Sequence, residues 1–182
     1  MTVNQKPGVQ ERILLHLLDY SDYKVSVEVP FALSQMGIAN AVSIARSNVP
    51  RAIAGLKDQG LLIERQAHVK GVSRKRKAYF LTEPGMNLAD DTWKRLRDFP
   101  IRAILEGGNI VATTLGNANQ ELPFSMRPVD LIRYLDDNGI LDTRLLSKEL
   151  VERDLSKHVE KQLVTALGDL PRLRHFYGRE QE

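Results

Sequence analysis

Four polar residues stand at the opening turns of one amphipathic segment: Arg46, Ser47, Asn48 and Arg51. Apolar residues recur behind them at steps of three and four, as on the buried face of a helix: Val49, Ala52, Ile53 and Leu56. Guanidinium and amide groups form paired hydrogen bonds with base edges, and a helix fits the major groove of DNA. The polar face, to which the helical period also assigns Gly55, is therefore predicted to meet a DNA duplex.

A second cationic stretch follows closely, in the sequence KGVSRKRK at residues 70–77. Residues 64–77 together carry six positive charges and one negative. We expect Lys70, Arg74, Lys75 and Arg76 to lie along phosphates or to enter the minor groove, and Lys77 to point inward beside Tyr79. Basic runs also occur as solubilising loops or RNA-binding patches, so this stretch alone leaves both alternatives open.

Chemistry of other kinds has little support in the sequence. The four histidines are scattered, cysteine is absent, and no nucleophile, base and orienting group stand in a catalytic pattern. Adjacent carboxylates such as Asp136 and Asp137 point in different directions on a helix, which argues against a paired acid–base role. We expect no catalytic activity, no metal and no cofactor, and the absence of a G-x-x-x-x-G-K-[ST] loop predicts no ATP binding of that type.

Charge is divided unevenly along the 182 residues. From Met1 to Arg97 there are 15 Lys and Arg against 9 Asp and Glu, a net charge of +6, whereas the rest carries 11 against 14, a net charge of −3. This split predicts an anionic partner for the first half. There is no membrane-spanning apolar run and no apolar signal core at the start, so together with the missing cysteines we expect a cytoplasmic protein without a membrane partner.

The first half predicts the element order helix, short strand, helix, helix, hairpin, helix. The expected bounds are Val9–Tyr20, Lys24–Val29, Phe31–Val42, Asn48–Gln59, the strands Leu61–Val69 and Ala78–Leu81, and a helix from Thr82 to about Asp98. Pro50 fits only in the first turn of its helix, so we expect that helix to begin near Ser47, with the Ser47 hydroxyl as its cap. This is the order of a winged helix-turn-helix.

Phe99 and Pro100 mark a predicted boundary between residues 1–98 and an accessory α+β region at residues 99–182. In that region we expect a hairpin of residues 101–105 and 110–115, a loop at 117–126, and helices over 128–137 and 143–167. The overall class is therefore mainly α with a small β content. The long apolar stripe of residues 143–167 either closes the core of this region or pairs with its copy in a homodimer.

Residues 33–85 resemble the MarR-like superfamily of winged-helix regulators, most closely an archaeal subset. The resemblance rests on a short set of motifs: Ser34-Gln35, Gly37-Ile38-Ala39, Arg46-Ser47, Arg51-Ala52-Ile53, Gly60-Leu61-Leu62, Arg74 to Tyr79, and Leu81-Thr82. It implies a sequence-specific transcriptional regulator that binds double-stranded DNA, with a recognition helix in the major groove and a basic wing on the backbone. Pro50 departs from the family pattern, which has a polar residue there.

The last residues, HFYGREQE at 175–182, resemble the opening of signalling ATPase modules of the NB-ARC-like type. That resemblance implies the N-terminal piece of a longer ATPase, with residues 99–182 as dimerisation region or linker. It also supplies the alternative function, an adaptor domain that uses its winged helix for protein contacts, because one fold serves several functions.

Overall fold

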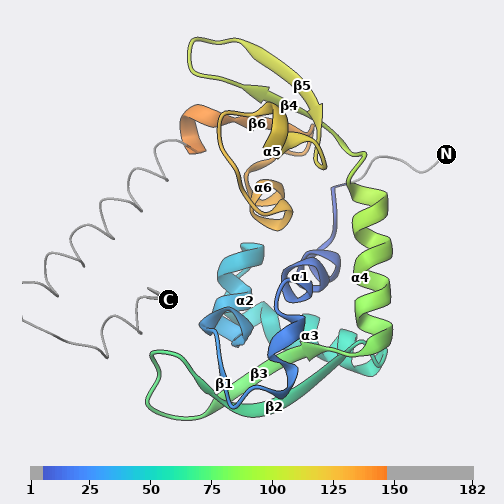
Figure 1. Cartoon of the computed structure of the whole chain (residues 1–182), viewed down its shortest axis with the longest axis vertical. Coiled ribbons are helices and arrows are strands. Elements are labelled where there is room, and N and C mark those ends of the chain that lie inside the picture. The colour runs from blue at the N-terminus through green and yellow to red at the C-terminus, as the bar shows by residue number, and fades with distance from the viewer. Residues whose placement is uncertain (1–5, 147–182) are drawn as a thin grey trace, which may run out of the picture.

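The computed structural model describes residues 6–146 of the chain. Figure 1 shows one region built on the sheet of β1, β2 and β3, a second built on the sheet of β4, β5 and β6, and helix α4 running along one side between them. The helices of the first region are α1 (Val9–Leu18), α2 (Gln35–Val42), α3 (Val49–Asp58) and α4 (Glu83–Leu96), and its strands are β1 (Glu28–Val29), β2 (Leu62–Val69) and β3 (Arg76–Leu81).

The first region is a winged helix-turn-helix, as the sequence predicts. Helix α1 contributes Ile13, Leu14 and Leu17 to the core, and α3 contributes Ile53 and Leu56. In α3 these residues follow the helical period, so one stripe is buried while the opposite side is exposed. Helix α1 is buried on more than one side, because Leu15 packs into the core of the second region and His16 is also buried. Strands β2 and β3 are antiparallel, and β1 pairs in parallel with the outer end of β2.

The segment predicted as one helix over residues 31–42 is a 3₁₀ turn at Phe31–Leu33 followed by α2. The Ser34 hydroxyl ends the turn and caps α2, because it donates to the Phe31 carbonyl and accepts from the Gly37 amide. The same turn brings the Phe31 carbonyl oxygen within 2.2 Å of the position a Cβ of residue 37 would occupy. Residue 37 must therefore be glycine for close packing, which outweighs the small cost of glycine in a helix.

The entry to α3 also differs from the prediction. Arg46–Asn48 form a 3₁₀ turn, Asn48 is the N-terminal flanking residue of α3, and no side chain caps that helix end. The expected cap by Ser47 is therefore wrong. Pro50 lies in the first turn as expected, where its missing amide costs no helical hydrogen bond. Gly60, with a φ of 72°, ends the helix in the left-handed conformation that the sequence predicts.

The predicted strand over residues 24–29 forms only at Glu28–Val29, and Ser21–Val25 is a 3₁₀ helix. Val25 and Val27 alternate as in a strand but are 90% and 78% exposed, so burial does not support the pattern. Arg65 supplies the reason. Its guanidinium donates to the carbonyls of Tyr23, Lys24 and Ser26, and thereby satisfies a backbone that has no strand partner at these residues.

The wing is the hairpin of β2 and β3, and its register joins Leu62 to Leu81 and Ala67 to Arg76. The strand β3 begins two residues earlier than predicted, so Arg76 and Lys77 lie in the strand and the loop is residues 70–75. After the wing, the Thr82 hydroxyl accepts from the Gly85 amide and donates to the Gly60 carbonyl. That cap begins α4 where the sequence predicts it.

The second region contains β4 (Pro100–Ile104), β5 (Ile110–Thr114), α5 (Ala118–Glu121), α6 (Pro128–Tyr134) and β6 (Ile140–Asp142). The predicted hairpin is confirmed, and so is the helix that begins at Pro128, although it ends at Tyr134 and not at Asp137. Helix α5 lies where a loop was expected over residues 117–126, and β6 was not predicted. Strand β6 pairs in parallel with β4, which gives the sheet order β5-β4-β6. The Asp136 carboxylate accepts from the amides of Asn138 and Ile140 and so shapes the turn before β6.

The two regions share apolar contacts and several polar ones, among them a cluster around Arg127. Val129 of α6 packs into the core of the first region. Next to it, Arg127 donates to Asp19 and Asp130, and its guanidinium lies 3.4 Å from Nδ1 of His16. Because arginine only donates, Nδ1 is the acceptor in that contact, and Nε2 of His16 carries the proton that it donates to the Ala32 carbonyl.

Protonation of His16 is expected to weaken the fold. Burial lowers the pKa of His16 from 6.5 to about 4 and is the largest cause of the shift. Between these values the unfolded chain binds more protons than the native chain, so the free energy of unfolding falls as pH drops. We expect a loss of about 2 kcal/mol from pH 6.5 to 4.5, measured by urea unfolding.

The matched variant is His16→Gln, whose amide can still donate to Ala32 but does not titrate. It should show a clearly flatter dependence of unfolding free energy on pH over the same interval. Identical pH profiles for the two proteins would show that His16 is not the titrating group.

Two predictions concern residues beyond the described part of the chain. For the predicted helix over residues 143–167, the structure describes only Thr143–Leu146, which are helical, and residues 147–167 lie outside the described residues. The stretch at 175–182 that resembles an ATPase opening also lies outside the described residues.

Candidate nucleic-acid interface

The predicted site residues come from two separated segments. Arg46, Ser47 and Asn48 form the 3₁₀ turn that leads into α3, Arg51 stands in its first turn, and all four are exposed. In the wing, Lys70 follows β2 and is half-buried. The exposed wing residues are Arg74, Lys75 and Arg76. The apolar stripe of α3 faces the core, which leaves its polar side to solvent.

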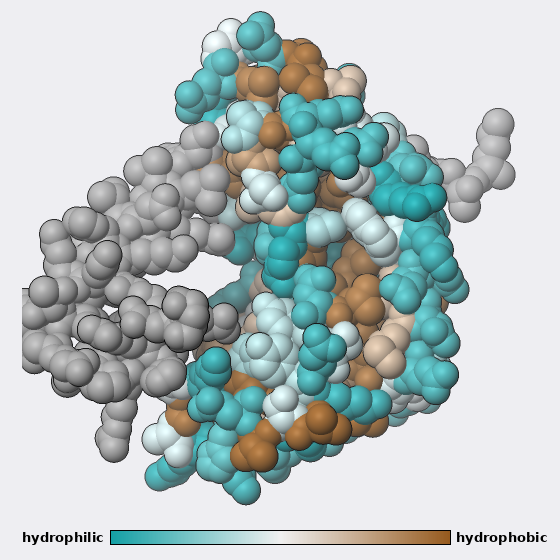
Figure 2. Space-filling model, in the orientation of Figure 1, coloured by the Kyte–Doolittle hydropathy of each residue, from teal (hydrophilic) through white to brown (hydrophobic). Residues whose placement is uncertain are grey.

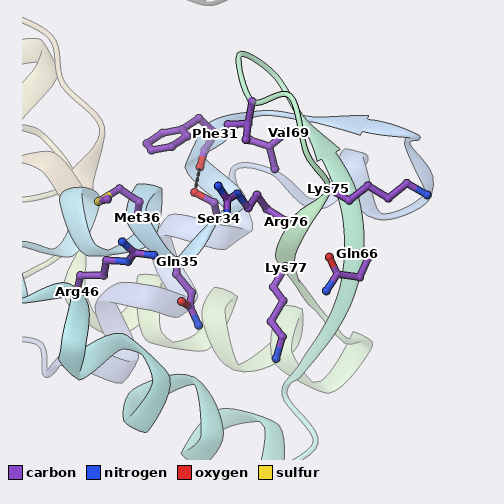
Figure 3. A pocket seen from close by; sticks show the side chains of 11 residues that line it. Phe31, Ser34, Gln35, Met36, Arg46, Gln66, Val69, Lys75, Arg76 and Lys77 are labelled. Atoms are coloured by element: carbon purple, nitrogen blue, oxygen red, sulfur yellow. Dashed lines mark hydrogen bonds between the residues drawn. The ribbon is translucent and has the colours of Figure 1, made fainter.

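A groove of about 410 Å³ separates the start of α2 and the 3₁₀ turn before α3 from the wing, and Figure 3 shows its lining side chains. Three of the predicted residues meet there: Arg46, Lys75 and Arg76. The other lining residues are Phe31, Ser34, Gln35, Met36, Gln66, Val69, Val72 and Lys77. The groove therefore brings Arg46 to the same hollow as two cations almost 30 positions later, while the other predicted residues lie outside its lining.

Six cations of this surface have no partner among the described residues: Arg46, Arg51, Lys70, Arg74, Lys75 and Arg76. Two neighbouring lysines differ, because Lys57 and Lys77 both bind the carboxylate of Glu64. Unpaired cations that gather around a concave surface raise its positive potential and attract anions. The arrangement suits a polyanion that contacts the start of α3 and the wing together.

Several groove residues were missed from the sequence. Gln35 occupies the first turn of α2, and its side-chain amide donates to the Tyr79 hydroxyl at 3.0 Å. Gln66 lies opposite Lys77 in the wing hairpin. The alternation of side chains along β2 could have indicated that Gln66 is exposed on the wing. The contact between Gln35 and Tyr79 joins residues 44 positions apart, so no local sequence pattern predicts it.

Two sequence-based expectations about side chains are wrong. Gly55 was placed on the free face of α3, but the Gln10 side chain lies 2.6 Å from where a Cβ of residue 55 would stand. Gly55 therefore packs against the start of α1. Lys77 was expected to point inward beside Tyr79, yet its side chain is 52% exposed and pairs with Glu64. The inward neighbour in that strand is Tyr79, which is buried.

The surface of the wing is mostly hydrophilic. Figure 2 shows hydrophilic residues over much of the wing and a few apolar ones along the lower edge of the molecule.

Within residues 6–146, no three His, Cys, Asp or Glu side chains gather in a way that could hold a metal ion. Over the same range, no helix combines the length and the apolar character needed to cross a membrane.

Comparisons with known proteins give matches of structure alone. No family model matches this sequence, and no curated protein matches it. MepR, a transcription regulator of the Staphylococcus aureus multidrug efflux pump MepA, is 19% identical with a TM-score of 0.38, over 48% of this chain and 56% of MepR. A double mutant of Lactococcus lactis ZitR in its apo form is 23% identical with a TM-score of 0.36, over 48% of this chain and 55% of ZitR.

A complex of Staphylococcus aureus MepR with DNA matches over 82% of this chain and 76% of MepR, at 15% identity and a TM-score of 0.34. In the first two matches the chain therefore spans just over half the length of those proteins. With TM-scores this low, the matches do not decide the function. The winged-helix fold stands on the order and pairing of the elements themselves.

Proposed function

We propose that this chain is a DNA-binding transcriptional regulator of the MarR-like kind, which places the start of α3 in the major groove and its wing on the phosphate backbone. The observation that supports this proposal is the set of six unpaired cations on the 3₁₀ turn, the start of α3 and the wing, three of which (Arg46, Lys75 and Arg76) line one groove. No structural role inside the described protein accounts for them. DNA phosphates are the partner that such a surface suits best.

The two arginines at the start of α3 have different roles in this proposal. Arg51 is exposed in the first turn and lies outside the groove lining, which supports the role that we assign to it, two hydrogen bonds donated to a guanine edge. Arg46 lines the groove beside Gln35 and is better placed for a phosphate. Ser47 and Asn48 are exposed between them and supply shorter polar contacts to bases or sugar-phosphate.

Lys70, Arg74, Lys75 and Arg76 hold the backbone in this proposal and fix the register of α3 on the duplex. Contacts of this kind depend on charge and reach rather than on sequence. A homodimer would place two such surfaces on half-sites about one helical turn apart. The footprint of a dimer on DNA would accordingly show two protected segments about 10 base pairs apart, centre to centre.

A salt titration tests the proposal. Binding to a random duplex and to fragments from upstream of the native gene is measured by gel shift at a series of salt concentrations. We expect affinity that falls steeply with salt, together with a footprint on one preferred sequence. The absence of binding at about 50 mM salt would contradict the proposal. Recovery of a protein partner in that case would support the alternative adaptor function, which no feature of the described residues favours.

A further inference from the structure

Glu64 joins the wing to the last turn of α3 through two lysines. Its Oε1 lies 3.0 Å from Nζ of Lys77 in β3, and its Oε2 lies 3.1 Å from Nζ of Lys57 in α3. Each lysine therefore has its own carboxylate oxygen. Hydrogen bonds from Lys77 and Lys57 lower the pKa of Glu64, so the carboxylate is charged at neutral pH.

This cluster, Lys57–Glu64–Lys77, adjoins the groove. Lys77 lines the groove directly, and its side chain is 52% exposed. Gln66 lies two residues after Glu64 in β2 and also lines it, and residues two apart in a strand share one face. In Figure 3 the Lys77 side chain runs from the wing toward the helices, away from the free ends of Lys75 and Arg76.

We propose that Glu64 limits sequence-independent DNA binding by holding Lys57 and Lys77 away from the phosphates. The inference rests on the proposed function. Sequence-independent affinity grows with the number of cations that neutralise phosphates, because each contact releases counterions. Glu64 pairs with two lysines, which are then not available to neutralise phosphates, and it adds a negative charge beside the groove. The five unpaired cations other than Arg51 then make the backbone contacts, and base contacts from α3 contribute a larger share of the binding free energy.

The variant Glu64→Gln keeps the size of the side chain and one oxygen acceptor but removes the charge. We expect it to bind a random duplex about 5- to 10-fold more tightly at about 0.1 M salt, with a slope of log affinity against log salt that is steeper by about one. This is the effect of one added phosphate contact, from Lys77, because Lys77 lines the groove and Lys57 does not. Fluorescence anisotropy with a labelled duplex measures both quantities. Thermal unfolding of the variant checks that the fold is intact, and Glu64→Thr is a second variant that removes the carboxylate and suits a strand.

The matched control is Asp91→Asn, which makes the same change in net charge. Asp91 pairs with Lys94 three residues later on α4, and neither lies in the groove lining. We expect less than about a twofold change in affinity from this control, because Asp91 holds none of the cations of the groove and exposed charges are screened by salt. A Glu64→Gln protein that behaves like Asp91→Asn would overturn the inference about Glu64, while salt-dependent binding by the parent protein would leave the proposed function standing.

A second experiment asks whether Lys77 is the released cation. Lys77→Ala should weaken binding several-fold more in the Glu64→Gln protein than in the parent, because only there is Lys77 free. Lys75→Ala should weaken binding by the same factor in both proteins, since Lys75 has no partner among the described residues. Equal effects of Lys77→Ala in the two backgrounds would contradict the inference. A parent protein that binds no DNA would overturn the proposed function and the inference with it.

Discussion

Replacement of Arg74, Lys75 and Arg76 by alanine should weaken binding to every duplex about 100-fold or more at about 0.1 M salt, since each lost phosphate contact costs roughly eightfold there. The slope of log affinity against log salt should flatten by about 2.7, or roughly 0.9 for each contact. None of the three side chains has a partner among the described residues, so their removal breaks no interaction in that part of the fold. Anisotropy titrations with a random duplex at several salt concentrations give both numbers.

The control for this wing variant is the triple change of Lys94, Arg95 and Arg97 to alanine. These cations lie near the C-terminal end of α4, which Figure 1 places at the opposite end of that helix from the wing sheet. The change in net charge is the same as in the wing variant. We expect only a small effect on affinity, because the proposed phosphate contacts of the wing are kept. Equal losses in the two variants would mean that overall charge, and not the wing, attracts the duplex.

Arg51→Ala should cost about 1–3 kcal/mol at the preferred DNA site, or roughly 5- to 150-fold in affinity, and should relax the base preference at one position. The reason is the loss of a bidentate contact from the first turn of α3, where Arg51 is exposed and unpaired. Competition with duplexes that carry single base substitutions measures the preference at each position.

Two matched variants separate charge from recognition. Arg51→Lys keeps the charge but loses the planar fork, so affinity for random duplex should be nearly unchanged while base preference falls. Arg102→Ala removes a guanidinium from the exposed face of β4, in the second region, and should alter neither quantity. An Arg51→Ala protein that discriminates bases as well as the parent would rule out the proposed role of Arg51.

Periodicity predicted the parts of the fold in which burial follows the local pattern. The stripes of α1 and α3 are buried as expected, and Gly60 and Thr82 end and begin their helices where turn chemistry requires. The pattern fails where a distant group decides the backbone. Val25 and Val27 alternate as in a strand, but Arg65, about 40 residues later, bonds the neighbouring carbonyls.

The sequence predicted which cations of the candidate site are exposed, but not which residues of the site lie together or form ion pairs. Residue type and helical spacing indicate which cations stand on the surface, and all eight predicted residues are at least partly exposed. Neither signal shows that Arg46 shares a groove with Lys75, or that Glu64 binds lysines from two other elements. Strand β6, with three residues, is too short for a periodic pattern, and it forms only because β4 offers it a parallel edge.

Chemical-shift mapping by NMR tests most directly whether one surface made of the start of α3 and the wing meets the duplex. Backbone amide signals are recorded for the free protein and during titration with DNA. We predict the largest changes at residues 46–51 and 70–76, with little change along the β4–β5 hairpin at residues 100–114. Changes confined to the hairpin or to α6, with residues 46–51 unaffected, would contradict the account.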